Sequence, residues 1–271
     1  MKILVIRFSS MGDIIYTTPV VRCLKKQLPG AEIHFLTKPA FKYIYGNNPY
    51  TDKLLLLKDR LSETIKEIKA ERYDYIIDLH NNLRTALIKL SVDVKSSTYK
   101  KQTMRKWLSL KLRLKLVPPI HLVERYLKAV AFLGVKNDGR PIDYYIKAEY
   151  QLSNLLPAEY QGNYVAFIIG ATHFTKRMPN EKIVSICRAI KQPVILLGGN
   201  DVKANGDEIA LQTDKVYNAC GETTLDESVF LVSKASRIIG FDTGLTHIAE
   251  AFDKPIASIW GGTAPELLGV Q

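Results

Sequence analysis

Short apolar runs alternate with helical patterns along most of the chain. Residues 2–7 predict a buried strand, a polar turn follows, and residues 14–28 repeat their apolar positions at helical spacing. Further strands are predicted at residues 33–37, 54–57, 75–79, 142–146, 164–169 and 194–197, and further helices at residues 61–68, 121–133 and 181–190, with one more that ends at residue 233. Strands that alternate with helices form parallel sheets, so the pattern predicts an α/β fold.

The clearest unit of this kind lies near the C-terminus. An apolar strand leads into the turn Asp242-Thr243-Gly244, a helix follows through residue 252, and residues 256–260 form a second strand that reads as buried. The turn falls at the carboxyl end of a parallel strand, where open α/β sheets bind ligands. A hydroxyl (Thr243), a glycine that allows close approach (Gly244) and an imidazole one turn later (His247) suit a phosphate group. A capped helix with a buried histidine explains the same residues equally well.

Two further polar turns are predicted at the same kind of sheet edge. Asp13 follows the first strand, where a carboxylate could serve as a general base or could cap the next helix. From the residues alone, capping is the better interpretation. His80 follows the strand at 75–79, beside Asn81, and its residues alone favour a hydrogen-bonded loop histidine.

Composition narrows the class of protein. The hydrophobic content of 46% argues against disorder, and the three cysteines are far apart, with no spacing typical of a zinc site or a disulfide framework. Neither a signal peptide nor an apolar run of membrane-spanning length is evident. We therefore expect a reduced, cytoplasmic location.

The charge is strongly basic and unevenly placed. The net charge is +11, and residues 84–115 hold ten lysines and arginines and one acid, Asp93. Within residues 98–117, leucines alternate with basic residues, which predicts a strand or ribbon with one apolar and one basic face. Such an element suits an anionic bilayer or a phosphorylated glycolipid, although charge runs are usually just solvated. Nucleic acid is disfavoured because no nucleic-acid-binding motif accompanies the charge.

A domain boundary is predicted where the pattern becomes irregular and polar. Residues 148–163 fit a linker, so we expect one domain at 1–155 and a second at 156–271. Neither half contains a G-x-G-x-x-G or P-loop motif, which argues against a standard dinucleotide or P-loop site, and no internal repeat is evident.

Several segments together resemble one known family, glycosyltransferase family 9, which includes the ADP-heptose:lipopolysaccharide heptosyltransferases. The carrying segments in the first half are ILVIRFSSMGDIIYTTPV, YDYIIDLHNNLRTA and HLVERYLKAVAFLGV. Those in the second half are GATHFTKRMP, LLGGND, GETTL and FDTGLTHIAEAFDKPIASIWGGTAPELLG. The resemblance runs in order along nearly the whole chain, and the S-S-M-G-D and D-T-G-L-T-H blocks are its most specific parts.

This resemblance implies a GT-B fold, in which two Rossmann-like domains with parallel sheets face each other across a cleft. The first domain would take the acceptor and the second the nucleotide sugar. Family members commonly continue beyond the position of Gln271, so the second domain is expected to be incomplete at its C-terminus. The implied activity is an inverting, metal-independent transfer of a heptose or similar sugar from an ADP-sugar to a lipopolysaccharide core or other glycolipid, with no cofactor. A non-catalytic, truncated relative that binds nucleotide or glycolipid is the alternative.

The resemblance also assigns residues to roles. Asp13 becomes the catalytic base. The nucleotide-sugar residues are Thr172, Lys176, Asp201, Thr223, Leu225, Asp242, Thr243, Gly244 and His247. The acceptor residues are Ser10, Met11, Gly12, His80, Asn81, Arg84 and Arg105. The expected partners are a nucleotide sugar, an anionic glycolipid and an anionic membrane surface, with any membrane contact peripheral, on the inner face of a bacterial inner membrane. The donor sugar and the oligomeric state are left open.

Overall fold

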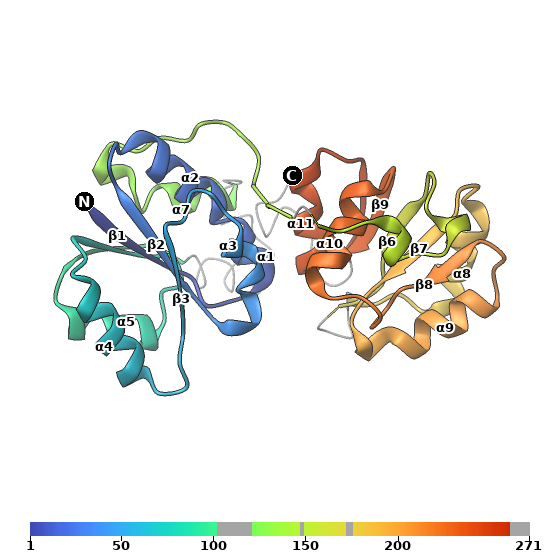
Figure 1. Cartoon of the computed structure of the whole chain (residues 1–271), viewed down its shortest axis with the longest axis horizontal. Coiled ribbons are helices and arrows are strands. Elements are labelled where there is room, and N and C mark those ends of the chain that lie inside the picture. The colour runs from blue at the N-terminus through green and yellow to red at the C-terminus, as the bar shows by residue number, and fades with distance from the viewer. Residues whose placement is uncertain (102–120, 147–148, 172–175, 261–271) are drawn as a thin grey trace, which may run out of the picture. The chain divides into compact units, whose positions relative to one another are not determined.

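The computed structural model describes residues 1–101, 121–146, 149–171 and 176–260, and it divides them into two compact units (Figure 1). The first unit comprises Met1–Tyr145, and the second begins at Ile146. Each unit has its own parallel sheet, with helices on both faces. The α/β class predicted from the alternating pattern is confirmed.

The first unit is built on a sheet with the strand order β3-β2-β1-β4-β5, all parallel. Its strands are β1 (Lys2–Ile6), β2 (Glu32–Thr37), β3 (Lys53–Leu56), β4 (Tyr75–Asp78) and β5 (Lys95–Thr98). Its helices are α1 (Met11–Ile15), α2 (Thr18–Gln27), α3 (Tyr43–Gly46), α4 (Leu61–Glu71), α5 (Leu83–Val92) and α7 (Leu122–Leu127), with short 3₁₀ turns at Pro39–Phe41 and Ala131–Leu133.

Period-two alternation along the strands separates two faces of this sheet. Leu4 and Ile6 of β1 point to the face where Ile68 of α4 and Ile88 of α5 complete a buried cluster. Helix α2 packs against β2 and against α7. The β1 strand lies in the middle and is buried along almost all of its length, as its unbroken apolar run predicts for a parallel sheet.

The single helix predicted at residues 14–28 is two helices, because Pro19 interrupts its hydrogen-bond ladder. Proline has no N–H to give to the carbonyl of Ile15. The hydroxyl of Thr18 donates to that carbonyl instead, at 2.8 Å, and the hydroxyl of Thr17 donates to Ile14 at 2.6 Å. The chain therefore turns between α1 and α2 while these buried carbonyls keep their partners.

Two expectations near residues 121–146 also need correction. The predicted helix at 121–133 has regular α geometry only as α7 and then tightens into a 3₁₀ turn, which ends at Gly134 with a positive φ, as its capping role requires. The strand predicted at 142–146 is wrong. This segment joins no sheet, because its polar groups bond to α2: the amide of Asp143 donates to Thr18, and the buried Arg22 donates to the carbonyl of Pro141.

The second unit repeats the same topology with the strand order β10-β9-β6-β7-β8. Its strands are β6 (Val165–Ile168), β7 (Val194–Leu197), β8 (Val216–Asn218), β9 (Arg237–Phe241) and β10 (Ile256–Ile259). Its helices are α8 (Asn180–Ala189), α9 (Lys203–Leu211), α10 (Leu225–Lys234) and α11 (Gly244–Ala249), with 3₁₀ turns at Leu152–Asn154, Ala158–Tyr160, Asn200–Val202 and Glu250–Phe252. Strand β10 is half exposed, so its predicted full burial is wrong.

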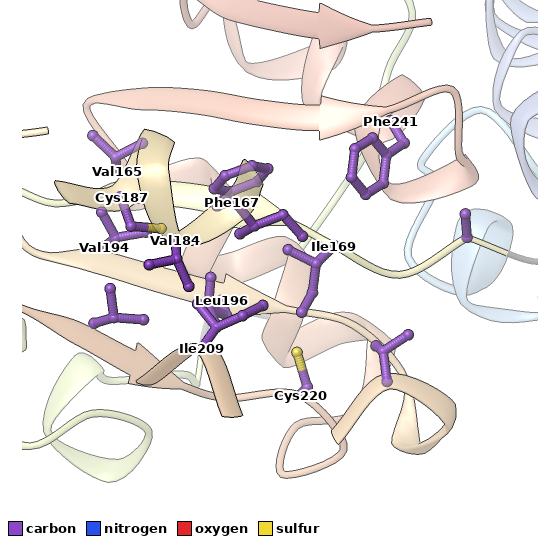
Figure 2. Packing of buried hydrophobic residues seen from close by; sticks show 14 residues of the cluster. Val165, Phe167, Ile169, Val184, Cys187, Val194, Leu196, Ile209, Cys220 and Phe241 are labelled. Atoms are coloured by element: carbon purple, nitrogen blue, oxygen red, sulfur yellow. The ribbon is translucent and has the colours of Figure 1, made fainter. Parts of the chain in front are cut away.

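Alternation again sorts the core of this unit into two clusters. Figure 2 shows one of them, in which Phe167 of β6 and Leu196 of β7 pack with Val184 and Cys187 of α8 and Ile209 of α9. The opposite cluster sets the intervening residues of β6 and β7 against α10 and α11. The helices thus flank the sheet on both sides. Among the described residues, no helix combines the length and apolarity that crossing a bilayer requires.

In both sheets the strand order reverses at the central strand, because the chain adds strands first on one side of it and then on the other. In the first unit, β1 lies between β2 and β4; in the second, β6 lies between β7 and β9. Ile6 is in register with Asp78, and Ile168 is in register with Gly240, so the carboxyl ends of the two central strands lie level in each sheet. These switch points are where doubly wound sheets bind ligands.

A prediction about stability follows from Gly240, which lies at the second switch point. A Cβ there would come within 2.4 Å of the Thr246 hydroxyl on α11 and 3.3 Å of Ile168 on β6. We expect Gly240→Ala to lower the free energy of unfolding of the second unit by about 1–3 kcal/mol, measured by urea denaturation. Gly162→Ala, whose Cβ would meet nothing within 4 Å, is the matched control. Equal stability of the two variants would contradict the prediction.

Candidate functional site

Asp13 lies at the switch point of the first unit and is held there by Arg7. The Arg7 guanidinium makes a 2.8 Å ion pair with Asp13 Oδ2, and the same oxygen accepts from the Ser10 hydroxyl at 2.8 Å and the Ser10 amide at 3.2 Å. Arg7 also donates to the carbonyl of Leu79, just after β4, at 2.5 Å. Arg7 thereby fastens the β1 turn to the end of β4.

The surroundings of Asp13 keep its carboxylate ionised. Burial opposes ionisation, but the charge of Arg7 and the hydrogen bonds from Ser10 outweigh it, so the pKa of Asp13 lies below its usual value. The Ser10 contacts show that Asp13 does cap α1, as its residues alone favoured. Within the described part of the chain, the other carboxylate oxygen, Oδ1, has only the Tyr126 hydroxyl as a partner, 3.5 Å away. This oxygen can take a further hydrogen bond from a substrate hydroxyl.

His80 and Asn81 lie beside this carboxylate, on the loop after β4. Burial, with the positive charges of Arg7 and Lys101, lowers the pKa of His80 to about 4, so its ring is neutral at pH 7. Its amide donates to Asp78 Oδ1 at 3.0 Å, whereas its buried ring Nδ1 has no hydrogen-bond partner among the residues that the structure describes. The Asn81 side chain donates to the carbonyl of Tyr99 at 3.0 Å, which ties this loop to the end of β5.

A basic pocket that the sequence did not predict adjoins the end of β5. It measures about 400 Å³ and is lined by Ser97, Thr98, Tyr99, Lys100, Arg125, Lys128 and Ala129. Arg125 is buried, packs over the Tyr99 ring and donates to its hydroxyl, while its Nε has no hydrogen-bond partner among the described residues. The only sequence signal for Arg7 and Arg125 was a charged residue next to an apolar run, which does not reveal what it contacts.

The other predicted acceptor residues divide into two groups. Ser10 is the N-cap of α1, and Met11 and Gly12 are the first two residues of that helix, next to Asp13. Arg84 is exposed in the first turn of α5, and Arg105 lies outside the described residues, as do most of residues 98–117.

At the second switch point, Asp242 joins two cations. Lys176, from the loop after β6, forms an ion pair with Asp242 Oδ2 and also donates to the Asp242 carbonyl at 3.1 Å. His247 Nε2 lies 3.1 Å from Asp242 Oδ1, and its Nδ1 lies 3.2 Å from Glu250 Oε1. The structure thus brings together three residues that the sequence placed at the donor site, Lys176, Asp242 and His247.

These contacts hold His247 in its charged form. Burial disfavours the imidazolium, but the bonds to Asp242 and Glu250 outweigh it and raise the pKa of His247 to about 9. The bond from His247, opposed by burial and aided by Lys176, holds the pKa of Asp242 below its usual value. The site therefore carries two positively charged side chains at neutral pH, which suits an anionic ligand.

The other predicted donor residues lie at the same edge of the sheet or near it. Thr243 precedes α11, with its hydroxyl 3.3 Å from that of Thr246, and Gly244 begins the helix. Asp201 is exposed and paired with Arg177. Thr223 shares a hydrogen bond with Ser228, and Leu225 begins α10. Thr172 lies outside the described residues.

A cluster of two glutamates and a histidine has the residue types of a metal site, but lysines are paired with its carboxylates. Ligand atoms of Glu32, His34 and Glu71 lie within 4.8 Å of one another. Lys2 contacts Glu71 at 2.6 Å and Glu32 at 3.2 Å, and Lys53 pairs with Glu71 as well. Because lysine ammonium groups already neutralise these carboxylates, the cluster is an ion-pair network at the amino-terminal edge of the sheet and not a metal site.

Comparison with known proteins gives the same picture along the whole chain. The family model described as glycosyltransferase family 9 (heptosyltransferase) matches residues 61–270. The chain is 25% identical over 292 residues to lipopolysaccharide heptosyltransferase 1 of Campylobacter coli, covering 97% of this chain and 84% of the relative. It is 27% identical over 275 residues to lipopolysaccharide heptosyltransferase 3 of Escherichia coli K12, covering 93% and 80% respectively.

Solved structures agree on the fold. The glycosyl transferase family 9 protein of Veillonella parvula superposes with a TM-score of 0.82 at 22% identity, covering all of this chain and 84% of that one. The E. coli heptosyltransferase WaaC with ADP gives a TM-score of 0.75 at 21% identity, covering all of this chain and 90% of that one. The pair of Rossmann-like domains is therefore that of the GT-B class.

The charge of His247 leads to a prediction about pH. We expect Asp242→Asn to lower the pKa of His247 from about 9 toward the usual value of about 6.5, because the carboxylate favours the imidazolium. Because the pKa of His247 is higher in the folded protein than in the unfolded chain, its charged form adds to the free energy of unfolding. This contribution is complete below pH of about 6.5 and is lost as the pH rises through about 9. Wild type should therefore lose stability over this pH range, and Asp242→Asn should not.

NMR titration of the histidine ring protons, assigned with His247→Gln, measures this pKa directly, and thermal unfolding across the same pH range measures the stability. Asp214→Asn, which removes an exposed acid of the same unit, is the control. A His247 pKa that stays near 9 in Asp242→Asn would show that the carboxylate is not its cause.

Proposed function

Because the chain belongs to glycosyltransferase family 9 (heptosyltransferase), we propose that it transfers a heptose or similar sugar from an ADP-sugar to a lipopolysaccharide core or related glycolipid. The curated relatives named above carry the name lipopolysaccharide heptosyltransferase, and one of the neighbouring structures is a heptosyltransferase with ADP. Two observations carry the proposal: the first unit holds a carboxylate, Asp13, at its switch point, and the second unit holds the cations Lys176 and His247 at its own.

The cationic cluster suits a diphosphate leaving group. When the anomeric carbon–oxygen bond breaks, the departing diphosphate gains negative charge, which preorganised donors must stabilise. His247 is buried, with its charge fixed by Asp242 and Glu250. The side chain of Lys176 is more exposed than that of Asp242, so Lys176 is free to turn from the carboxylate toward a phosphate. Two cations without a metal can then meet the leaving-group charge, which makes the proposed reaction metal-independent.

Asp13 suits the complementary role of general base. It is ionised at neutral pH, and its Oδ1 is open to an acceptor hydroxyl. A base on the acceptor side that deprotonates this hydroxyl allows a single displacement from the face opposite the diphosphate, which inverts the anomeric configuration. The low pKa makes Asp13 a weak base in the resting protein, so proton transfer has to accompany bond formation rather than precede it.

The proposal predicts a specific defect in Asp13→Asn. Its kcat/KM for transfer from ADP-heptose should fall about 10²–10⁴-fold, because the amide cannot accept the proton. Its Kd for ADP, measured by calorimetry, should stay within about twofold of wild type, because the ADP residues lie in the second unit. Asp59→Asn, which removes an exposed acid of the first unit, should transfer normally.

Two outcomes would contradict this assignment. Wild-type turnover in Asp13→Asn would remove the catalytic role of that residue. A wild-type protein that binds ADP but gives no product with ADP-heptose and a lipid A-type acceptor would be a binding protein and not a transferase.

The absence of a metal requirement is tested separately. We expect the transfer rate to be unchanged in excess EDTA and unchanged again when Mg²⁺ or Mn²⁺ is restored, because Lys176 and His247 supply the positive charge. NMR of the product should show an anomeric configuration opposite to that of the donor. A rate that is lost in EDTA and restored by a divalent cation would overturn the metal-independent mechanism.

A further inference from the structure

Helix α5 presents a row of exposed leucines to solvent. Leu83 and Leu90 are each 78% exposed and Leu87 is 44% exposed. Residues spaced four and seven apart lie on one face of an α-helix, so the three side chains form a continuous stripe. Thr85 and Ile88, on the inward face, are fully buried. The helix is therefore anchored by one apolar face while it exposes another, and large exposed apolar patches usually mark interaction sites.

The surroundings of this leucine stripe are basic. Arg84 is exposed on the same helix, Lys95 is exposed at the start of β5, and Lys100 is exposed just after that strand. The exposed acid along this stretch of the chain, Asp93, lies at the end of the helix, so the basic groups are in excess. The segment that begins at Arg84 is also the part of the chain with ten basic residues and one acid. Apolar side chains bordered by lysine and arginine match the surface of an anionic bilayer, where acyl chains lie beneath a layer of phosphates.

The position of the stripe suits the proposed acceptor. Leu83 follows directly after Asn81 and Asn82, on the loop at the carboxyl end of β4 that also carries His80. Because β4 borders the switch point, the stripe begins beside the acceptor residues. A lipid-anchored acceptor can reach those residues only if this part of the molecule approaches the membrane surface.

We propose that the face formed by Leu83, Leu87 and Leu90 docks on an anionic lipid bilayer. The leucines insert at the boundary of the acyl chains, and the neighbouring basic residues contact lipid phosphates. The inference rests on the proposed function for its biological setting, but it concerns a different surface, and its binding experiments need no sugar donor.

The first experiment is co-sedimentation of the full chain with vesicles of equimolar phosphatidylethanolamine and phosphatidylglycerol. Leu83→Gln/Leu90→Gln should weaken partitioning into these vesicles at least about tenfold, because even half burial of two leucines accounts for that factor. Glutamine retains good helix propensity, and circular dichroism with thermal unfolding checks that the fold is kept. Leu211→Gln removes a leucine that is 89% exposed on α9 of the second unit, and this matched control should bind like wild type.

Charge is tested with a second variant and a second vesicle. Lys95→Gln/Lys100→Gln should weaken binding and reduce its salt dependence, and pure phosphatidylcholine vesicles should bind wild type more weakly than the anionic ones. Wild type that does not sediment with anionic vesicles, or a double leucine variant that binds like wild type, overturns the proposal. A native mass of two chains that falls to one in the double leucine variant also overturns it, because the face then binds a second copy.

The two proposals fail in different ways. The double leucine variant should keep wild-type transfer to a deacylated, water-soluble acceptor while its transfer to a vesicle-embedded acceptor falls. Asp13→Asn should bind vesicles normally and transfer to neither acceptor. Loss of transfer with intact vesicle binding therefore concerns the proposed enzyme activity, and the converse concerns the leucine stripe.

Discussion

An ion pair across the switch point of each sheet is the interaction on which both candidate sites depend. At a switch point, the connections that follow two neighbouring parallel strands turn to opposite sides of the sheet. The backbone carbonyls just after these strands then have no strand to pair with. Arg7 satisfies one such carbonyl, that of Leu79, and Lys176 satisfies the carbonyl of Asp242. Each cation also pairs with a carboxylate, Asp13 or Asp242. The same cation therefore satisfies a carbonyl at the end of the sheet and fixes the position of a carboxylate.

The two ion pairs have opposite patterns of burial. In the first unit the cation is the buried member: the side chain of Arg7 is 8% exposed and that of Asp13 is 33% exposed. In the second unit the anion is the buried member, with Asp242 at 6% and Lys176 at 29%. The accessible member is thus a carboxylate in one unit and an ammonium group in the other. A carboxylate can accept a proton and an ammonium can bind phosphate, so in the proposed transfer one topology would supply both the base and the cation that meets the leaving group.

The sequence predicted what local patterning controls and missed what depends on distant partners. Unbroken apolar runs identified the buried strands, and the polar turns after them located Asp13, Asp242 and His247, because both features are local. Pro19 split a predicted helix because the hydroxyl of Thr18 could replace the missing amide, a contact that periodicity does not encode. Strand β5, with the sequence KSST, carries no apolar pattern at all and pairs only because β4 offers it an edge.

The charge of the chain can now be divided between site and surface. At the second switch point Lys176 and His247 face Asp242 and Glu250, and at the first Arg7 faces Asp13, so the cations there are matched by carboxylates. The net charge of +11 therefore resides elsewhere, on groups such as Arg84, Lys95 and Lys100 that are exposed. Matched charges in a site bind a small ligand by exchanging partners, whereas unmatched surface charges attract an extended anionic partner at a distance. The excess is thus better explained by the proposed membrane surface than by the proposed nucleotide sugar.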